Sequence, residues 1–443
     1  MSTCRTAMII LGASGDLAGR KLIPALRRLY EEGVFDASCA VIGSGRTAFD
    51  DDSFRRHLGA ETDFASLLHY HQGLDGLREY VEALGTFDQT IVFFSLPPRV
   101  YADTAAALAQ RGFGDRTRLI IEKPFGYDYD SARDLNRRLG AFFNEQHIYR
   151  IDHYLAKEAV RNILVFRFAN SLFDPVWNSR YLESIQINAC EEEGVGHRAQ
   201  YFDGAGVIRD MVQNHLMQLL CLMTMEAPVS LDAEDIRAQK LAVLKSLKIE
   251  ECRRGQYEGY REEEGVRPDS STETYAEIRA SINSFRWTGM PIFIRTGKAV
   301  HRKGTEIGVR FKSVPRLLFN EDGLVAPNRI VFKIQPAEGI LLDLAGKDPG
   351  DETMRVTTMN MAFCYRSIFP GEIPEAYRKL LADAIRGDRT LFVSARETEL
   401  SWKLLQPFLD KGDPVPYPRG ALPESKLLKD WIDFDAYKSM CAS

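Results

Sequence analysis

A glycine-rich turn near the N-terminus is the first group of residues whose spacing can do chemistry. The run GASGDLAG, residues 12–19, lies between the apolar stretch Ala7–Leu11 and an amphipathic stretch. Glycine lets the main chain approach a pyrophosphate, and the amides and dipole of a following helix attract its charge. The spacing G-x-x-G-x-x-A differs from the usual motif, so a tight turn without a ligand is the alternative. The residues expected to contact a dinucleotide are Gly12, Ser14, Gly15, Asp16 and Leu17.

The end of the second expected strand, Cys39–Ile42, indicates which dinucleotide this is. An NAD site usually has an acidic residue about 20 residues beyond the glycines. This chain has Ser44-Gly45-Arg46 instead, and Asp50–Asp52 come later, where they are typical of a helix start. A guanidinium can pair with a 2′-phosphate and stack on adenine, so Arg46 favours NADP, with NAD as a secondary cofactor. An exposed surface arginine is the alternative.

A lysine follows the expected strand Arg118–Glu122. Lys123, in the run IEKPFG, lies where the carboxyl edge of a parallel sheet usually holds a ligand. Its ammonium can donate to both a cofactor and substrate hydroxyls. Glu122 with Lys123 as a solvated ion pair is the alternative.

The run RIDHYLAKE, residues 150–158, is the densest polar cluster that follows an apolar strand. If a helix begins near His153, then His153 and Lys157 lie one turn apart on one face, with Tyr154 beside them. Several donors and positive charge in one place predict a clamp for a phosphate group. The alternative is a solvated helix whose N-cap is Asp152.

A histidine lies on the apolar stripe of the expected helix Ala205–Met225. An imidazole titrates near neutrality, so a buried His215 oriented by a carboxylate would be a natural general base. A core histidine with its hydrogen bonds satisfied is the alternative. The residues that make this end of the helix polar are Arg209, Asp210, Gln213 and Asn214.

Positive charge also follows the expected strand Pro291–Arg295. Lys298, and Lys303 five residues later, can face a substrate oxyanion, or else form a solvated strand end. The chain has no H-E-x-x-H motif, no Walker A motif and no hydrolase nucleophile motif. The sequence therefore favours an oxidoreductase and predicts no metal.

The elements that must position these residues fall into two classes. In the N-terminal part, wholly apolar strands alternate with amphipathic helices, including Arg20–Glu31 and Tyr101–Ala109. Strands covered on both faces have this pattern, so we expect a Rossmann-like, doubly wound α/β domain over residues 1–175. The strands expected besides those above are Thr90–Leu96 and the apolar run before Arg150.

Beyond residue 175 the pattern changes to alternation. In Glu273–Ile282, three apolar residues alternate with charged or polar ones, which is typical of an antiparallel sheet with unlike faces. We expect a larger α+β domain over residues 176–443, with a mostly antiparallel sheet, flanking helices and a surface loop at Asp413–Gly420. Its other expected strands are Glu306–Phe311, Arg329–Gln335 and Met354–Ala362. Its expected helices are Ala233–Leu247, Glu375–Ile385 and Glu397–Leu409.

The composition limits the class of protein. The 443 residues carry 57 Lys and Arg against 62 Asp and Glu, a formal charge of -5, which argues against a nucleic-acid binder. No apolar run reaches the ~20 residues of a membrane span, so we expect a cytoplasmic protein. Seven dispersed cysteines without a C-x-x-C pair predict free thiols.

Six motifs together resemble the glucose-6-phosphate dehydrogenase family, essentially from end to end. They are GASGDLAGRKLIPAL, IEKPFG, RIDHYLAKE, RDMVQNHLMQLL, IRTGKA and PEAYRKLLADAIRGDRTLFV. The resemblance implies oxidation of the C1 hydroxyl of glucose 6-phosphate to the 1,5-lactone, with NADP as hydride acceptor. It also implies a homodimer or homotetramer formed through the large sheet.

The resemblance assigns roles residue by residue. His215 matches the catalytic base and Asp152 the carboxylate paired with it. Cofactor contacts are implied for Ser14, Arg46, Tyr101 and Lys123. Phosphate contacts are implied for His153, Tyr154 and Lys157. Sugar contacts are implied for Lys123, Glu191, Asp210, Lys298 and Lys303.

The chain departs from the family pattern at two places. Ala156 stands where the family usually has glycine, and the region Gly59–Gly85 is shorter than usual. Neither change removes a charged or catalytic group. Two alternatives stay open: a dehydrogenase of a related sugar phosphate, and a non-catalytic cofactor-binding regulatory homologue.

Overall fold

The computed structural model describes residues 5–59, 63–114, 116–320, 325–352, 354–369 and 375–441. The chain forms two compact units. The first comprises Met1–Lys157, Pro228–Ala238 and Ile373–Trp402, and the second comprises Glu158–Ala227, Gln239–Glu372 and Lys403–Ser443.

The first unit is built on a seven-stranded sheet in the order β15-β6-β5-β4-β1-β2-β3. All neighbouring strands are parallel except β15, which runs antiparallel to β6. This is the doubly wound order of a dinucleotide-binding fold, as the apolar strands predicted. The strands are β1 (Thr6–Leu11), β2 (Ala40–Gly45), β3 (Leu68–Gln72), β4 (Gln89–Phe94), β5 (Thr117–Ile121), β6 (Ile148–Ile151) and β15 (Phe392–Val393).

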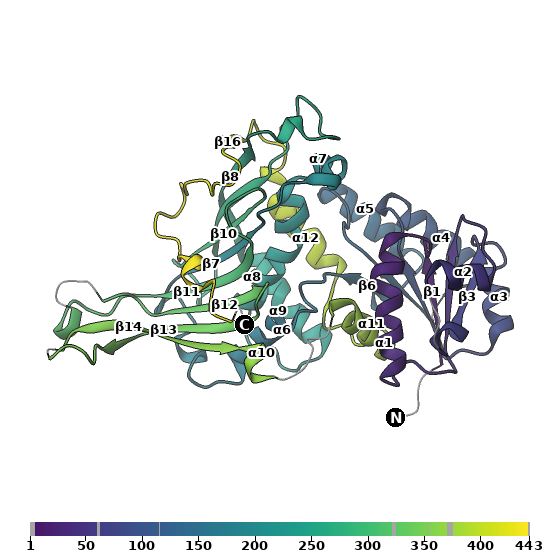
Figure 1. Ribbon diagram of the computed structural model, residues 1–443, viewed down its shortest axis with the longest axis horizontal. Coiled ribbons are helices and arrows are strands. Elements are labelled where there is room, and N and C mark those ends of the chain that lie inside the picture. The colour runs from purple at the N-terminus through teal and green to yellow at the C-terminus, as the bar shows by residue number, and fades with distance from the viewer. Residues whose placement is uncertain are drawn as a thin grey trace. The chain divides into compact units, whose positions relative to one another are not determined.

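Helices lie on both faces of this sheet (Figure 1). The first helix starts at Asp16, four residues before the predicted Arg20, and contains the π-helical turn η1 (Ala18–Leu22). The apolar side chains of β1, β4 and β5 are almost fully buried and form one core with the helices. The helices are α1 (Ile23–Glu31), α2 (Asp51–His57), α3 (Leu77–Leu84), α4 (Tyr101–Gln110), α5 (Tyr129–Gly140), α11 (Ala376–Arg386) and α12 (Ala395–Leu405).

The second unit is built on a nine-stranded sheet in the order β14-β13-β12-β11-β7-β10-β9-β8-β16. Six of its eight neighbouring pairs are antiparallel; β7 with β10 and β8 with β16 are parallel. The mostly antiparallel sheet is therefore confirmed. The strands are β7 (Leu182–Cys190), β8 (Leu247–Tyr257), β9 (Tyr275–Ile282), β10 (Pro291–Gly297), β11 (Gly304–Phe311), β12 (Arg329–Gln335), β13 (Gly339–Lys347), β14 (Val356–Cys364) and β16 (Val415–Tyr417).

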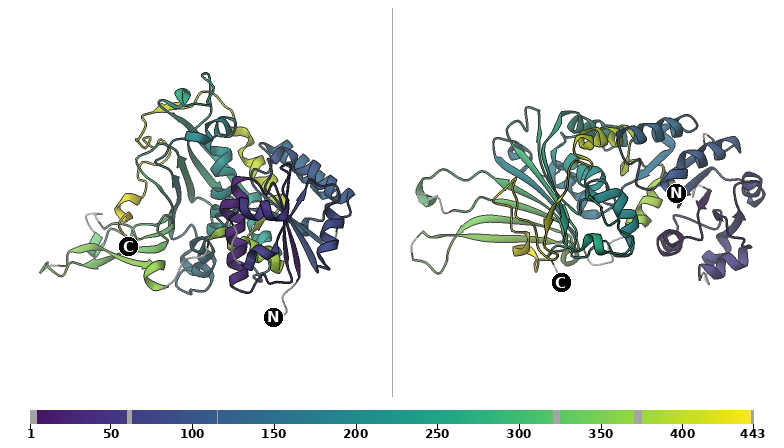
Figure 2. Two further views of the ribbon diagram at one scale, coloured as in Figure 1. Left: turned by 45° about the vertical axis from the view of Figure 1, so that its right-hand side comes forward. Right: turned by 90° about the horizontal axis from the view of Figure 1, so that it is seen from above.

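Strands β13 and β14 reach beyond the rest of their sheet (Figure 2). The predicted loop at Asp413–Gly420 contains the short strand β16, which pairs with β8. The remaining helices are α6 (Glu158–Phe168), α7 (Ala199–Val207), η7 (Ile208–Leu216), α8 (Met217–Thr224), α9 (Ala233–Ser246) and α10 (Tyr365–Ile368). None of the helices in the described ranges is long and apolar enough to span a membrane.

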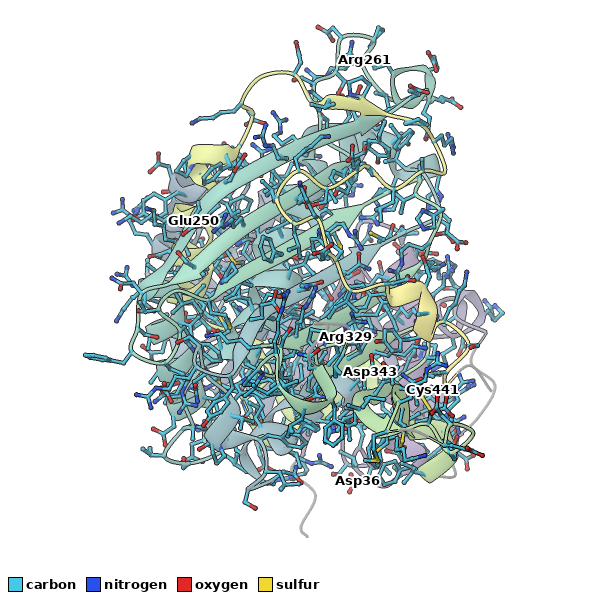
Figure 3. All side chains as sticks on the ribbon, turned by 90° about the vertical axis from the view of Figure 1, so that its left-hand side faces the viewer. Asp36, Glu250, Arg261, Arg329, Asp343 and Cys441 are labelled. Atoms are coloured by element: carbon cyan, nitrogen blue, oxygen red, sulfur yellow. A yellow bond between two sulfur atoms is a disulfide. The ribbon has the colours of Figure 1, made fainter. Side chains whose placement is uncertain are left out.

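The C-terminal segment, residues 425–441, crosses one face of the large sheet as a strap (Figure 3). Trp431 Nε1 donates to Glu277 Oε1 at 3.1 Å, and the main-chain amide of Ile432 donates to Gln186 Oε1 at 2.7 Å. The strap ends in a disulfide between Cys441 and Cys364. The prediction that all seven cysteines are free thiols is therefore wrong, because the strap brings together two cysteines that are 77 residues apart.

Candidate active site

The glycine-rich turn joins β1 to the first helix at the carboxyl edge of the seven-stranded sheet. Gly12 has φ +83°, and a Cβ there would lie 2.1 Å from the Ser95 main-chain oxygen. The amide of Gly12 donates to the Ser44 carbonyl at 2.7 Å, so the ends of β1 and β2 are tied together. The turn then enters a helix at Asp16. The predicted cofactor residues Ser14, Gly15, Asp16 and Leu17 all lie in this turn or at the helix start.

The end of β2 presents a basic side chain. Arg46 is exposed directly after β2, and its carbonyl accepts from Gln72 Nε2 at 3.1 Å. The acidic residues that follow β2 make hydrogen bonds at the start of α2, as predicted for a helix start. Asp50 is the N-cap of α2, accepting the amide of Ser53 at 2.7 Å, and the hydrogen bonds from Ser53 lower its pKa. Asp51 Oδ1 accepts the amide of Tyr70 at 2.8 Å.

Lys123 follows β5 at the same edge of the sheet. The neighbouring Glu122 accepts a hydrogen bond from the Tyr377 hydroxyl at 2.8 Å. Burial raises the pKa of Glu122 to about 7, even though Tyr377 and Lys123 both favour its charged form. Tyr101, by contrast, is a core residue. It is 1% exposed, and its ring centroid lies 5.7 Å from that of Phe94.

Residues 152–157 follow β6 as a series of tight turns, not as the start of a helix. Helix α6 begins at Glu158, so the predicted helix from His153 is wrong. Asp152 is 1% exposed, and its Oδ1 accepts the amide of Tyr154 at 2.9 Å, which favours a turn over a helix. The turns still gather the three expected phosphate ligands. The Tyr154 ring lies 5.2 Å from the His153 ring and 5.6 Å from the Lys157 ammonium.

In the second unit, Asp210 and His215 lie on one short helix. The predicted uninterrupted α-helix over Ala205–Met225 is wrong: the chain kinks at Gly206 and then forms the π-helix η7. Residues five apart are hydrogen-bond neighbours in a π-helix, whereas they lie on different faces of an α-helix. Asp210 and His215 are 4% and 1% exposed. Because a π-helix has about one more residue per turn than an α-helix, Asp210 lies about one turn before His215.

Two sugar-contact candidates form a pair. Glu191 follows β7 and Lys298 follows β10, and these parallel strands end at the same edge of the large sheet. The Lys298 ammonium donates to the Glu191 carboxylate. It also lies 5.4 Å from the centroid of the Phe202 ring. Lys298 is thus a buried cation with a fixed position, not a solvated strand end.

Lys303 precedes β11 at that edge and is exposed. Its ammonium donates to Glu193 Oε1 at 2.7 Å, and this contact raises the pKa of Lys303 and lowers that of Glu193. Sequence reasoning missed Glu193, although it belongs to the acidic run Glu191–Glu193. It also missed Arg198, whose guanidinium lies 3.7 Å from the Asp210 carboxylate.

Both halves of the chain match models of one family. Residues 9–162 match "Glucose-6-phosphate dehydrogenase, NAD binding domain" and residues 164–431 match "Glucose-6-phosphate dehydrogenase, C-terminal domain". The chain belongs to the glucose-6-phosphate dehydrogenase family.

Relatives in this family support the assignment over nearly the full length. The glucose-6-phosphate 1-dehydrogenase of Rhizobium meliloti is 38% identical over 90% of this chain and 90% of its own length. The chloroplastic one of Spinacia oleracea is 38% identical over 94% of this chain and 80% of its own. A structure described as glucose-6-phosphate dehydrogenase in complex with its substrate glucose-6-phosphate has a TM-score of 0.89 at 35% identity, covering 96% of this chain and 97% of that one.

Proposed function

We propose that this chain oxidises the C1 hydroxyl of glucose 6-phosphate to 6-phosphoglucono-1,5-lactone, with NADP as the hydride acceptor. The main support for the proposal is that residues from four predicted motifs lie together at the carboxyl ends of the parallel strands. Gly12, Arg46, Lys123 and Asp152 follow β1, β2, β5 and β6 at one edge of the first sheet. Open parallel sheets bind nucleotides at that edge.

The residues at that edge fit a dinucleotide phosphate. A side chain at Gly12 would fill the space that a close main-chain approach needs, since its Cβ would collide with Ser95. Asp50 and Asp51 already accept hydrogen bonds from the amides of Ser53 on α2 and Tyr70 on β3. This leaves Arg46 as the side chain after β2 that would hold the 2′-phosphate of NADP. When bound, NADP⁺ supplies a hydride acceptor at its nicotinamide C4.

The phosphate of the sugar would be held by His153, Tyr154 and Lys157. These side chains offer an imidazole, a phenol and an ammonium within one tight turn. Binding energy from this remote phosphate would position C1 for reaction. Ala156, 1% exposed, lies within the same turn and adds a methyl group where the family usually has none.

His215 would act as the general base. It takes the proton of the C1 hydroxyl while the C1–H bond breaks and the carbonyl of the lactone forms. We assign Asp152 the role of the carboxylate that orients this imidazole and stabilises the imidazolium. The sugar hydroxyls would contact Glu191, Asp210, Lys298, Lys303 and Lys123.

The test is a set of initial rates with NADP and with NAD on glucose 6-phosphate, glucose and an amino sugar phosphate. We expect the highest kcat/KM with glucose 6-phosphate and NADP, and a much lower value with unphosphorylated glucose. A higher kcat/KM with the amino sugar phosphate would move the assignment to that substrate. Absence of reduction with every sugar phosphate would instead indicate a regulatory homologue.

We also propose a homodimer or homotetramer formed through the large sheet. Its edge strand β14 exposes Met359, Met361 and Phe363 by 45–50% each, and such an apolar patch is typical of an interface. Light scattering with size-exclusion chromatography should give at least twice the chain mass of 50.1 kDa. A cytoplasmic location, expected from the sequence, is tested by cell fractionation.

A further inference from the structure

The turn that carries Lys123 is held by a part of the chain more than 250 residues away. Tyr377, on α11, donates from its hydroxyl to Glu122 Oε1 at 2.8 Å. Trp402, on α12, donates from Nε1 to the carbonyl oxygen of Phe125 at 3.0 Å. These two bonds lie on either side of Lys123, so the returning segment Ala376–Trp402 fixes the turn at both ends.

The surroundings of Tyr377 suit a rigid contact. Burial is the main cause that raises the pKa of Tyr377, and the negative charge of nearby Glu122 is the second. The Tyr377 hydroxyl therefore keeps its proton and stays a hydrogen-bond donor. The next glycine, Gly126, has φ +80°, and a Cβ there would lie 2.6 Å from the Ala132 amide nitrogen, so the turn packs closely against α5.

Two residues of the candidate site act electrostatically on the Glu122 carboxylate. Lys123 stabilises its carboxylate, whereas Asp152, on the turn after β6, destabilises it. Glu122 is therefore electrostatically coupled to two residues with proposed roles, although it has no role of its own in the reaction. A lysine has a long, flexible side chain, so its ammonium is directed only if its main chain and neighbours are fixed.

We propose that Tyr377 and Glu122 are positioning residues that direct the Lys123 ammonium toward the cofactor and the sugar. The proposal rests on the role given to Lys123 above. Neither residue touches the reacting atoms; the hydrogen bond between them holds the main chain from which Lys123 projects. The segment containing α11 and α12 is thus part of the machinery of the cofactor edge.

A double-mutant cycle on kcat/KM tests this proposal. Tyr377→Phe removes one hydroxyl and should lower kcat/KM about ten-fold, as expected for a lost hydrogen bond to a charged group. In the background of Lys123→Met the same change should cost less than about two-fold, because the ammonium that it directs is gone. Equal losses in both backgrounds, or no loss in either, would overturn the proposal.

The Lys123→Met variant alone separates this proposal from its premise. Near-normal kcat/KM for that variant would overturn the role given to Lys123 and the positioning role with it. A large loss that is additive with the loss from Tyr377→Phe would keep the role of Lys123 and overturn the positioning role alone.

A matched control is Tyr80→Phe. The Tyr80 hydroxyl donates to Asp51 Oδ1 at 3.3 Å in the same unit, so the variant also removes a partly buried tyrosine–carboxylate bond. Its kcat/KM should stay within about two-fold of wild type. If it falls as far as that of Tyr377→Phe, the loss reflects general destabilisation and the proposal is wrong.

A second pair of variants covers the case in which Tyr377→Phe fails to fold. Glu122→Ala removes the acceptor, whereas Glu122→Gln keeps an acceptor for the Tyr377 hydroxyl. We expect about a ten-fold loss of kcat/KM for the alanine variant and recovery of most of it for the glutamine variant. Equal losses in the two variants would show that the charge acts alone and would overturn a role for the hydrogen bond.

Discussion

Glu273 Oε1 accepts a hydrogen bond from the main-chain amide of Ile208 at 3.1 Å, at the first residue of the helix that carries Asp210 and His215. The Glu273 carbonyl also accepts the amide of Val207 at 3.0 Å, so one residue satisfies two amides at this kink. Arg254 holds the same carboxylate at 2.9 Å, and both side chains are buried. The proposed base therefore depends on a buried ion pair for the start of its helix.

His215→Asn is expected to lower kcat by about 10²–10⁴-fold with little change in KM for the sugar phosphate, because asparagine cannot take the proton. Steady-state kinetics with NADP and glucose 6-phosphate check this. His301→Asn is the control, since His301 is exposed and contacts Asp435 at 3.2 Å. Near-normal turnover of His215→Asn would rule out the base assignment.

Arg46→Ala is expected to raise KM for NADP about 10–100-fold, because a charge-assisted contact to the 2′-phosphate is lost. KM for NAD should change by less than about two-fold, since NAD lacks that phosphate. Arg27→Ala on α1, which removes an exposed contact to Glu31, should alter neither value. Equal effects on both cofactors would contradict the NADP interpretation of Arg46.

Gly206→Ala should destabilise the second unit and lower kcat together. Gly206 has φ +72°, and a Cβ there would lie 2.4 Å from Glu273 Oε1, so the variant would disturb the cap of η7. We expect a cost of about 1–3 kcal/mol in unfolding free energy, seen as a lower Tm in thermal melting. Gly204→Ala is the control on the same helix, because a Cβ there would meet no heavy atom within 4 Å apart from its chain neighbours and the helix's own backbone. A Tm for Gly206→Ala equal to that of the control would contradict this account.

Glu122 should make the stability of the enzyme fall as pH rises. Burial raises its pKa from 4.5 to about 7 in the folded chain, so the native state binds the proton more tightly than the unfolded state does. Its contribution is constant below about pH 4.5 and decreases up to about pH 7, by at most ~3 kcal/mol.

Thermal melting of wild type and Glu122→Gln measures this contribution. Between about pH 5 and pH 8 the glutamine variant should gain Tm relative to wild type, because glutamine does not ionise. A constant difference in Tm over that range would show that the carboxyl does not titrate there.

Reduction of the Cys364–Cys441 disulfide should loosen the C-terminal strap. A covalent link that closes a loop of 77 residues contributes about 2–4 kcal/mol through the entropy of the unfolded chain. Cys441→Ser should therefore be cleaved faster by a protease within residues 425–441 than wild type, and dithiothreitol should accelerate cleavage of wild type and of Cys252→Ser but not of Cys441→Ser. Cys252→Ser, which changes a free thiol, is the control. Equal cleavage rates for all three proteins would contradict a stabilising role for the link.

The sequence by itself determined the fold class and the family. Wholly apolar strands must be covered on both faces, and here they alternate with amphipathic helices, so the runs around β1, β4 and β5 predicted a parallel sheet, with the ligand edge at the carboxyl ends of its strands. Asp50 was identified as a helix start because its pattern is local, and the structure confirms its capping box.

Only the tertiary structure decided the features that depend on distant parts of the chain. The π-helix that carries Asp210 and His215 follows a kink held by Glu273, which lies 65 residues beyond Ile208. Helical periodicity carries no signal for this kink. The turn at 152–157, by contrast, has a local cause, the hydrogen bond from the Tyr154 amide to the Asp152 carboxylate. The bonds of Tyr377 to Glu122 and of Cys364 to Cys441 join residues 255 and 77 positions apart. Such pairs form only when packing brings their segments together, so no local pattern in one sequence encodes them.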